Sequence, residues 1–321
     1  MNNELPVIRS DDLTKVYRSR HGDTLALDSL NLEVWPGEIF GYLGPNGAGK
    51  TTTIRMLLDL IRPMRGTAEI LGMDARAESV AIHRRIGFLP GELSLWKART
   101  GRQVVQYIAS VRGMPSTAYA DELAERLALD LSRRVRDYSS GNRRKLGLVI
   151  ALMHEPELLI LDEPTNGLDP LVQQTFNQLM RETRDAGRTV FLSSHLLGEV
   201  QAICDRVGIL KDGRLKAVET VERLTHVDFR WVRLQFREAV PAATMARLER
   251  LPGASDVDVA HHTVSLRLTG DFMPLLDAVD GLYIEDIRVE EPTLEEVFLT
   301  YYGNNGATPT RAGTRKVMEV L

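Results

Sequence analysis

The sequence predicts an α/β core with an antiparallel β layer, a helical lobe and a smaller C-terminal α+β domain. A glycine-rich loop at residues 44–49 stands between a short apolar run and a segment with helical spacing. Two further apolar runs, 158–161 and 189–192, have the unbroken hydrophobicity of strands buried on both faces of a parallel sheet. After residue 227 short alternating strands separated by helices predict a second domain.

The composition is typical of a soluble globular protein. Of 321 residues 43% are hydrophobic and 26% charged, and the formal net charge is −4. This charge gives no general attraction for nucleic acid, so we expect no nucleic-acid partner. We expect no secretory signal and no membrane span, because the required apolar runs are missing. The single cysteine, Cys204, excludes an internal disulfide and is expected to be buried.

The N-terminal part is expected to form the antiparallel layer. Residues 7–14 and 28–34 alternate as strands do, and a turn rich in Gly, His and Ser separates them. Tyr17 lies near the end of the first strand, where two interpretations are open. It is an ordinary half-exposed aromatic side chain, or a flat ring on which an adenine stacks.

A phosphate-binding pattern, G-x-x-x-x-G-K-[ST], follows the strand at 38–43 and precedes a helix expected at 52–60. Its glycines let backbone N–H groups face a phosphate, and the positive helix end faces the same anion. Lys50 supplies a charge for the β- and γ-phosphates, and the Thr51 hydroxyl is a ligand for Mg²⁺. A chance match in a glycine-rich turn is the alternative, which the flanking strand and helix argue against. The candidate residues are Gly44, Pro45, Asn46, Gly47, Ala48, Gly49, Lys50, Thr51 and Thr52.

The middle of the chain is expected to add strands and the helical lobe. Residues 66–72 and 86–90 have the pattern of strands. The pattern from Thr100 to Met153 is almost wholly helical, which predicts a lobe over about residues 95–153. A hairpin signal at Asp212-Gly213 closes the first domain, which we expect to span residues 1–224.

Two carboxylates follow the expected central strand. Ligands bind beyond the carboxyl ends of such strands, so Asp162 is expected to hold Mg²⁺. Glu163 is expected to orient or deprotonate an attacking water. His195 ends the strand that begins at Thr189 and is expected near the γ-phosphate. Solvated acids and a structural histidine are the alternatives.

A helix of the lobe opens with two hydroxyl groups and a glycine. A serine at this place is an ordinary N-cap. The same groups at the positive end of a helix also form an anion site. The residues alone leave open whose anion this site would bind, because the helix lies in the lobe and Lys50 in the core. The segment is Ser139-Ser140-Gly141-Asn142, called the signature segment below.

In this order the motifs resemble those of the ATP-binding subunit of an ATP-binding cassette (ABC) transporter. The resemblance runs from about residue 5 to 224 and includes Gly167-Leu168-Asp169. It implies a P-loop NTPase cassette that hydrolyses ATP with Mg²⁺, and a homodimer that holds two ATP molecules between its subunits. It further implies that the signature segment contacts the γ-phosphate held by the other subunit. The roles implied for single residues are adenine stacking for Tyr17, communication between the sites for Asp169 and γ-phosphate sensing for His195.

The resemblance also implies partners and a location. We expect an integral membrane permease as a separate subunit and a peripheral position on the cytoplasmic face of the cell membrane. Export of a drug, antibiotic or lipid-like cargo is favoured. A soluble ABC ATPase acting on ribosomes or DNA is the first alternative, which the single cassette and the lack of sustained heptads argue against. A nucleotide kinase is the second, which the signature segment and His195 argue against.

Two departures from the family pattern matter. A glutamine that contacts Mg²⁺ and links the site to the membrane subunit usually follows the strand at 86–89, whereas here Pro90 precedes Gly91 and Glu92. We expect either that Glu92 takes part of this role, or that the backbone and Trp96 make the link. The signature segment has Ser and Asn where Gly and Gln are usual, which gives no support for fast hydrolysis.

The C-terminal third is expected to be a ferredoxin-like domain over residues 225–303, from its order of strands and helices. A last helix is expected from Thr293, and residues 292–298 resemble the C-terminal extension of exporter ATPases. We expect this domain to support the dimer rather than to bind a ligand. His261 and His262 are expected on opposite faces of a strand, which argues against a metal site. We expect residues 304–321 to be a flexible tail.

Overall fold

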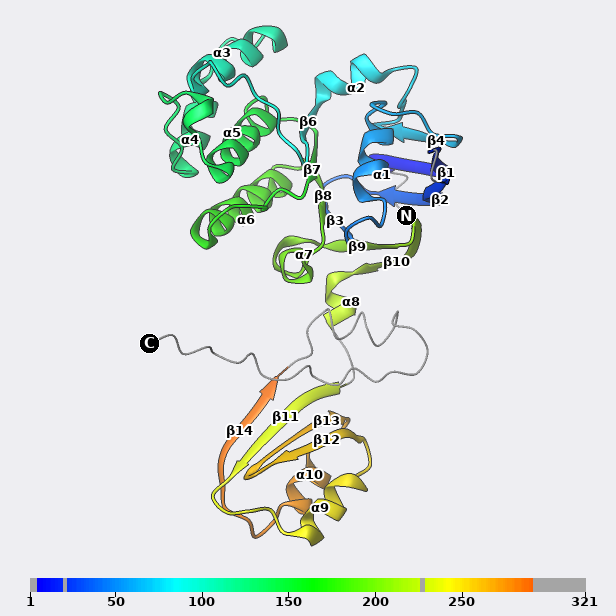
Figure 1. Ribbon diagram of the computed structural model, residues 1–321, viewed down its shortest axis with the longest axis vertical. Helices are drawn as coiled ribbons and strands as arrows, with labels where there is room; N and C mark the ends of the chain where they lie inside the picture. Colours follow the sequence, from blue (N-terminus) through cyan, green and yellow to red (C-terminus); the bar gives the residue numbers. More distant parts are fainter. Residues whose placement is uncertain (1–4, 20–21, 226–228, 291–321) are drawn as a thin grey trace. The chain divides into compact units, whose positions relative to one another are not determined.

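The computed structural model describes residues 5–19, 22–225 and 229–290 (Figure 1). The chain divides into two compact units between Val221 and Glu222. The expected helix from Thr293, the segment 292–298 and the tail at 304–321 lie outside the described residues. In the part that is described, no helix combines the length and the apolar character needed to cross a bilayer.

The larger sheet of the first unit has the strand order β10-β9-β3-β8-β7-β6, in which only β10 runs antiparallel to its neighbour. Every residue of β3, β7 and β8 is buried, as their continuous apolar runs predict. The strands are β3 (Ile39–Leu43), β6 (Ile86–Leu89), β7 (Leu158–Asp162), β8 (Thr189–Ser194), β9 (Arg206–Lys211) and β10 (Arg214–Thr220).

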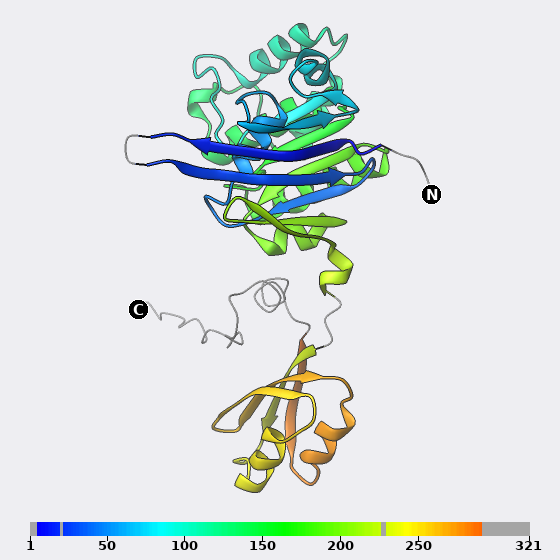
Figure 2. The ribbon, with the colours of Figure 1, turned by 90° about the vertical axis from the view of Figure 1, so that its right-hand side faces the viewer.

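The smaller sheet has the order β2-β1-β4-β5 and is antiparallel, which confirms the expected layer. Figure 2 shows β1 and β2 as a long pair at the front of this unit. The helix α1 (Lys50–Leu57) contacts β2 and β4 on one side and β7 on the other, so it packs between the two sheets. The strands are β1 (Ile8–Tyr17), β2 (Thr24–Val34), β4 (Arg65–Ile70) and β5 (Met73–Asp74).

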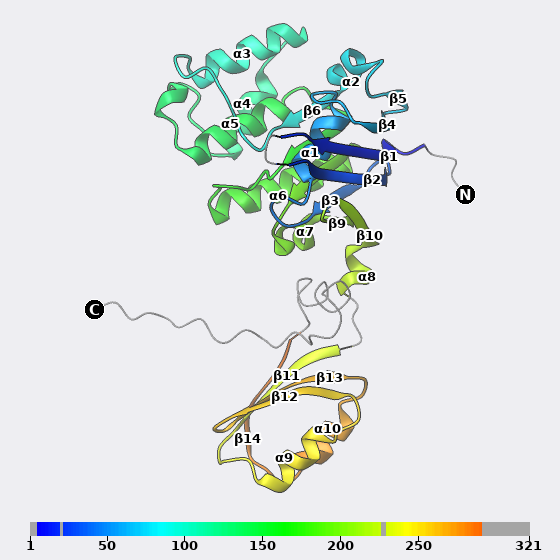
Figure 3. The ribbon, with the colours of Figure 1, turned by 45° about the vertical axis from the view of Figure 1, so that its right-hand side comes forward.

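The helical lobe gathers beyond the edge strand β6, on the side opposite the smaller sheet (Figures 1 and 3). Its first helix starts at a capping box, in which Thr100 and Gln103 bond each other's backbone N–H. Loops at residues 113–117 and 127–134 separate its helices, so the segment from Thr100 to Met153 is less continuously helical than expected. The lobe comprises α3 (Gly101–Arg112), α4 (Ala118–Arg126), the 3₁₀ turn η1 (Val135–Asp137) and α5 (Ser140–Leu152).

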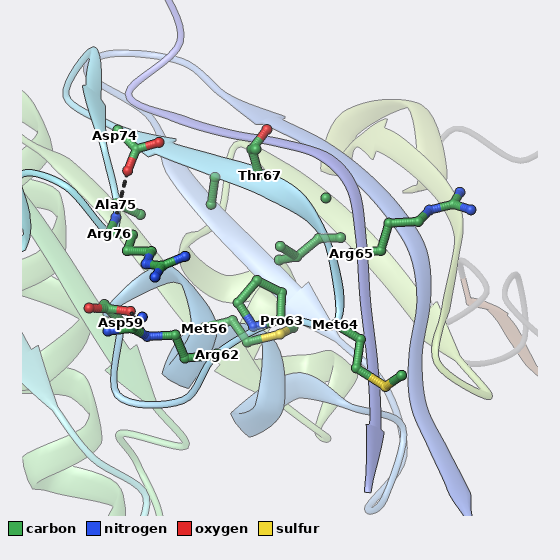
Figure 4. A pocket seen from close by; sticks show the side chains of 13 residues that line it. Met56, Asp59, Arg62, Pro63, Met64, Arg65, Thr67, Asp74, Ala75 and Arg76 are labelled. Atoms are coloured by element: carbon green, nitrogen blue, oxygen red, sulfur yellow. Dashed lines mark hydrogen bonds and ion pairs between the residues drawn. The ribbon is translucent and has the colours of Figure 1, made fainter.

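The remaining helices of the first unit are α2 (Ser79–Arg85), α6 (Pro170–Asp185) and α7 (Leu197–Ile203), and the short helix α8 (Val221–Thr225) begins at the boundary between the two units. α6 and α7 pack on β3 and β8. Cys204 follows α7 and is buried, as expected, and this burial raises the pKa of its thiol. A hollow beside the C-terminal end of α1 is lined by buried Leu13 and Met56 and by exposed arginines (Figure 4), and it contains none of the candidate site residues.

The second unit confirms the βαββαβ order expected of a ferredoxin-like domain. Its antiparallel sheet has the order β12-β13-β11-β14, and its core contains Val232, Leu234 and Phe236 from one face of β11. The elements are β11 (Phe229–Phe236), α9 (Ala242–Glu249), β12 (Ala254–Ala260), β13 (Thr263–Thr269), α10 (Met273–Ala278) and β14 (Ile284–Glu290).

The expected strand positions of His261 and His262 are wrong. Both residues form the exposed turn between β12 and β13, and His261 has a left-handed backbone with a φ of 55°. A two-residue hairpin turn needs positive φ, and the alternation of side chains across a strand does not apply there. In the described part of the chain no group of three or more His, Cys, Asp or Glu side chains is placed to hold a metal ion.

Candidate functional site

The candidate phosphate loop connects β3 to α1, and its glycines are required by space and by conformation. Gly49 has a φ of 111°, and a Cβ on it would lie 2.5 Å from the carbonyl oxygen of Ala26. A Cβ on Gly44 would lie 2.4 Å from the carbonyl oxygen of Leu210. α1 begins at Lys50, so Lys50, Thr51 and Thr52 form its first turn, two residues before the expected helix start. The loop therefore presents backbone and a helix N-terminus to a ligand, as phosphate binding requires.

Lys50 is 5% exposed and lies inside this loop. Its ammonium group donates to the carbonyl oxygens of Gly44 at 2.6 Å and Pro45 at 3.2 Å. It also forms an ion pair with Glu163, with 3.2 Å between Nζ and Oε1. A buried positive charge is thus held at the centre of the loop, where it can bind the oxygen atoms of a phosphate.

Asp162 is 1% exposed at the end of β7, so it is not a solvated acid at a strand end. Its Oδ2 accepts a hydrogen bond from the Thr51 hydroxyl at 2.8 Å, and its Oδ1 accepts one from the Ser193 hydroxyl at 2.6 Å. A carboxylate and a hydroxyl beside a phosphate loop are the oxygen ligands that Mg²⁺ prefers. The donor set of Thr51 and Asp162 therefore fits Mg²⁺.

Glu163 lies between the ammonium group of Lys50 and the imidazole ring of His195. Besides the ion pair with Lys50, its Oε2 lies 2.5 Å from Nδ1 of His195. Its backbone is left-handed, with a φ of 51°, and its N–H donates to the Ser193 hydroxyl at 3.1 Å. A non-glycine residue in this region is strained and persists only where several contacts hold it. The structure thus brings together Lys50 from the start of α1, Glu163 after β7 and His195 after β8.

The signature segment and Asp169 lie at two exposed helix starts. The Ser139 hydroxyl accepts from the N–H of Asn142 at 3.2 Å and caps α5. Asp169 caps α6 by accepting from the N–H of Val172 at 3.1 Å. A Cβ on Gly141 would lie 2.7 Å from the carbonyl oxygen of Gly167, so the two segments pack closely. The role of the segment in binding an anion stays a prediction.

Tyr17 is the last residue of β1 and is 41% exposed. The ammonium group of Lys15 lies 5.5 Å from the centre of its ring. The ring is therefore accessible to a planar ligand and already has a cation beside it, which suits an electron-rich ring face. Stacking on adenine stays a prediction.

Three residues at this site were missed by the sequence interpretation. Ser193 holds both Asp162 and Glu163, and Glu199 accepts from the Ser194 hydroxyl at 2.6 Å and from Thr165. The polar pair Ser193-Ser194 at the end of an apolar strand is a signal that could have found the first. Arg144 of α5 reaches the ends of β6 and β7, and no sequence signal pointed to it.

Glu92 and the backbone with Trp96 were the two expected substitutes for the missing glutamine, and they lie in different surroundings. Gly91 lies against Asp162, since a Cβ on it would be 3.0 Å from Oδ2, whereas the Glu92 side chain is exposed. Trp96 is half exposed and packs edge to face on Tyr107, with 4.9 Å between the ring centres. The backbone at Gly91 is therefore better placed than Glu92 to contact groups bound at Asp162.

We expect Glu92→Ala to leave the rate of ATP hydrolysis nearly unchanged in the assembled transporter, because the Glu92 side chain points to solvent. The measurement is the steady-state release of phosphate, with the wild-type assembly as reference. A loss of about tenfold or more, the size seen when a partner of a metal ligand is removed, would instead give Glu92 the role of the glutamine.

The chain is similar in sequence and in fold to known proteins. The family model described as ABC transporter matches residues 27–166. The daunorubicin resistance ATP-binding protein DrrA3 of Streptomyces coeruleorubidus is 38% identical over 298 residues, which cover 89% of this chain and 94% of that protein. The bacitracin transport ATP-binding protein BcrA of Enterococcus faecalis is 32% identical over 309 residues, which cover 94% and 97%.

One solved structure, of an ATP-binding subunit of an ABC transporter, superposes with a TM-score of 0.62 at 30% identity. It covers 68% of this chain and 91% of the other. The two sequence alignments are longer than the first unit, so the similarity to those relatives continues into the second.

Proposed function

Because the chain belongs to the ABC transporter family of ATP-binding proteins and is an ATP hydrolase, we propose that it powers an exporter formed with a separate membrane permease. The relatives named for daunorubicin resistance and bacitracin transport support a drug, antibiotic or lipid-like cargo. The observation that carries the proposal is the position of Glu163 between Lys50 and His195. That arrangement supplies a base for water and a cation for phosphate in one place.

The residues of the site have distinct roles in this proposal. Lys50 and the backbone of residues 44–49 bind the β- and γ-phosphates, while Thr51 and Asp162 hold Mg²⁺, which would neutralise phosphate charge when bound. Glu163 accepts a proton from the attacking water or orients it. His195 lies within hydrogen-bond distance of Glu163 and can bind an oxygen of the γ-phosphate from the same side.

We further propose that two copies close on two ATP molecules. Ser139 to Asn142 form an N-terminal helix turn with exposed hydroxyl groups on the lobe, which suits the γ-phosphate held by the second copy. Tyr17 stacks on the adenine, and Asp169 connects the two sites through its place beside the signature segment. ATP then favours the closed state and its hydrolysis releases it.

The proposed partner is an integral membrane permease, with this chain bound at the cytoplasmic face of the membrane. The test is purification of the full chain from detergent extracts of membranes, followed by reconstitution of what co-purifies into vesicles. We expect a polytopic membrane protein and transport that needs ATP and is lost with Glu163→Gln. Recovery of ribosomes or DNA in place of a membrane protein would contradict the proposal.

A further inference from the structure

We propose that Arg144 is the positioning residue that holds the metal-binding and catalytic carboxylates in place and couples them to the signature segment. Arg144 lies on α5, two residues after Asn142, and its side chain is 5% exposed. This inference rests on the roles proposed for Asp162 and Glu163, and it does not depend on the permease or the cargo.

The Arg144 guanidinium group donates to four backbone carbonyl groups at the ends of two strands. Nη1 lies 2.7 Å from the oxygen of Pro90 and 3.2 Å from that of Gly91. Nη2 lies 3.3 Å from the oxygen of Asp162 and 2.5 Å from that of Glu163. A planar fork of donors can join two segments in this way, whereas a single ammonium group cannot.

These contacts continue the pairing of β6 and β7 beyond the point where the sheet ends. The last partners in the parallel ladder are Leu89 and Leu161. Pro90 has no N–H to donate, so the ladder cannot extend through it. Arg144 therefore sets the separation of the two chain segments that follow, which carry Gly91 on one side and Asp162 and Glu163 on the other.

Both segments matter to the site chemistry. Gly91 lies against Oδ2 of Asp162, the same oxygen that accepts from Thr51, so a shift of this backbone would disturb the candidate Mg²⁺ ligands. Glu163 has the strained left-handed backbone, and the bond from Arg144 to its carbonyl is one of the contacts that hold it. Loss of that bond is expected to release the carboxylate from its position beside Lys50 and His195.

Arg144 also connects these strand ends to the lobe. It lies two residues after Asn142, whose N–H donates to the Ser139 hydroxyl, so the proposed anion-binding end of α5 and the guanidinium group belong to the same helix turn. A displacement of α5 when the signature segment meets a phosphate is thereby transmitted to Gly91 and Glu163. Burial opposes the charge and lowers the pKa of Arg144, while Asp162 and Glu163 favour the charged form.

The chain offers a matched control for a purely structural role. Arg112 of α3 also joins the lobe to backbone carbonyl groups, those of His83, Arg84 and Ile86 at 3.2 to 3.5 Å. Its bonds reach the start of β6, the end opposite to the site. Arg112→Gln should therefore lower thermal stability as Arg144→Gln does, without changing the metal site or the catalytic rate.

The experiment compares wild type, Arg144→Gln, Arg144→Lys, Arg112→Gln and Glu163→Gln in the full chain. It measures kcat and KM for ATP, and the affinity for Mn²⁺ in the presence of ADP by electron paramagnetic resonance. For Arg144→Gln we expect kcat and Mn²⁺ affinity each to fall about 10–100-fold, as for other residues that hold metal ligands in place, with little change in KM. For Arg144→Lys we expect losses at the lower end of this range. Because lysine keeps the positive charge, this variant serves as the test if Arg144→Gln does not fold.

The outcomes separate this inference from the proposed function. The role of Arg144 would be overturned if Arg144→Gln had the kcat and the Mn²⁺ affinity of the wild type while Glu163→Gln was inactive. If Arg144→Gln does not fold, the same criterion applies to Arg144→Lys. Equal losses in Arg112→Gln and Arg144→Gln would also overturn it, because they would show a general effect of loosening the lobe. Full activity of Glu163→Gln would instead contradict the proposed catalytic residue.

Discussion

Lys50→Ala is expected to abolish most ATP hydrolysis, with a fall of about 100-fold or more, the usual effect of removing one preorganised group that stabilises transition-state charge. The ammonium group is buried and is held by the carbonyl oxygens of Gly44 and Pro45. Alanine removes the positive charge at the centre of the phosphate loop and leaves Glu163 without its ion-pair partner. A hydrogen bond to a charged group contributes about 1.5–3 kcal/mol, so ATP affinity should also fall about 10–100-fold.

The measurements are phosphate release and titration of a fluorescent ATP analogue. Lys216→Ala is a suitable control, because Lys216 is an exposed lysine on β10. Lys50→Arg should not restore activity, since the loop closes around a compact ammonium group and a guanidinium group has a different shape. If Lys50→Ala binds and hydrolyses ATP like wild type, residues 44–52 are not the phosphate site.

Glu163→Gln is expected to lower hydrolysis by about 10²–10⁴-fold, the range contributed by a positioned general base. Glutamine has nearly the same size as glutamate and can still contact Lys50 and His195, but its amide cannot accept a proton from water. Binding of ATP is therefore expected to be retained. With cleavage blocked, the closed pair of subunits should accumulate in the presence of Mg²⁺ and ATP.

The dimer is measured by size-exclusion chromatography with light scattering, for the chain alone and in its assembly. ADP in place of ATP is the first control, because the γ-phosphate that both subunits are proposed to contact is then missing. The double variant Lys50→Ala, Glu163→Gln is the second and should remain monomeric. A Glu163→Gln protein that never pairs with itself under saturating Mg²⁺ and ATP contradicts the proposed mechanism.

Features that depend on neighbouring residues were predictable from the sequence. The candidate phosphate loop is a run of contiguous residues, some of whose backbone conformations need glycine, as at Gly49. The buried strands β3, β7 and β8 follow from continuous apolar runs, and the capped start of α5 follows from Ser139. The exception is the pair His261 and His262, because one residue of shift between strand and turn changes the direction of both side chains.

The fold class and the positions of the candidate phosphate loop and of Asp162 and Glu163 at a strand end could therefore be predicted from the sequence, since local patterning specifies them. Contacts between groups that are distant in the sequence became known from the three-dimensional fold alone. Thr51 contacts Asp162, Ser193 contacts both acids and Arg144 clamps two strand ends. These partners are far apart in the chain, and their contacts depend on the order of strands in the sheet and on how the lobe packs against it. Spacing along the sequence carries no information about such packing.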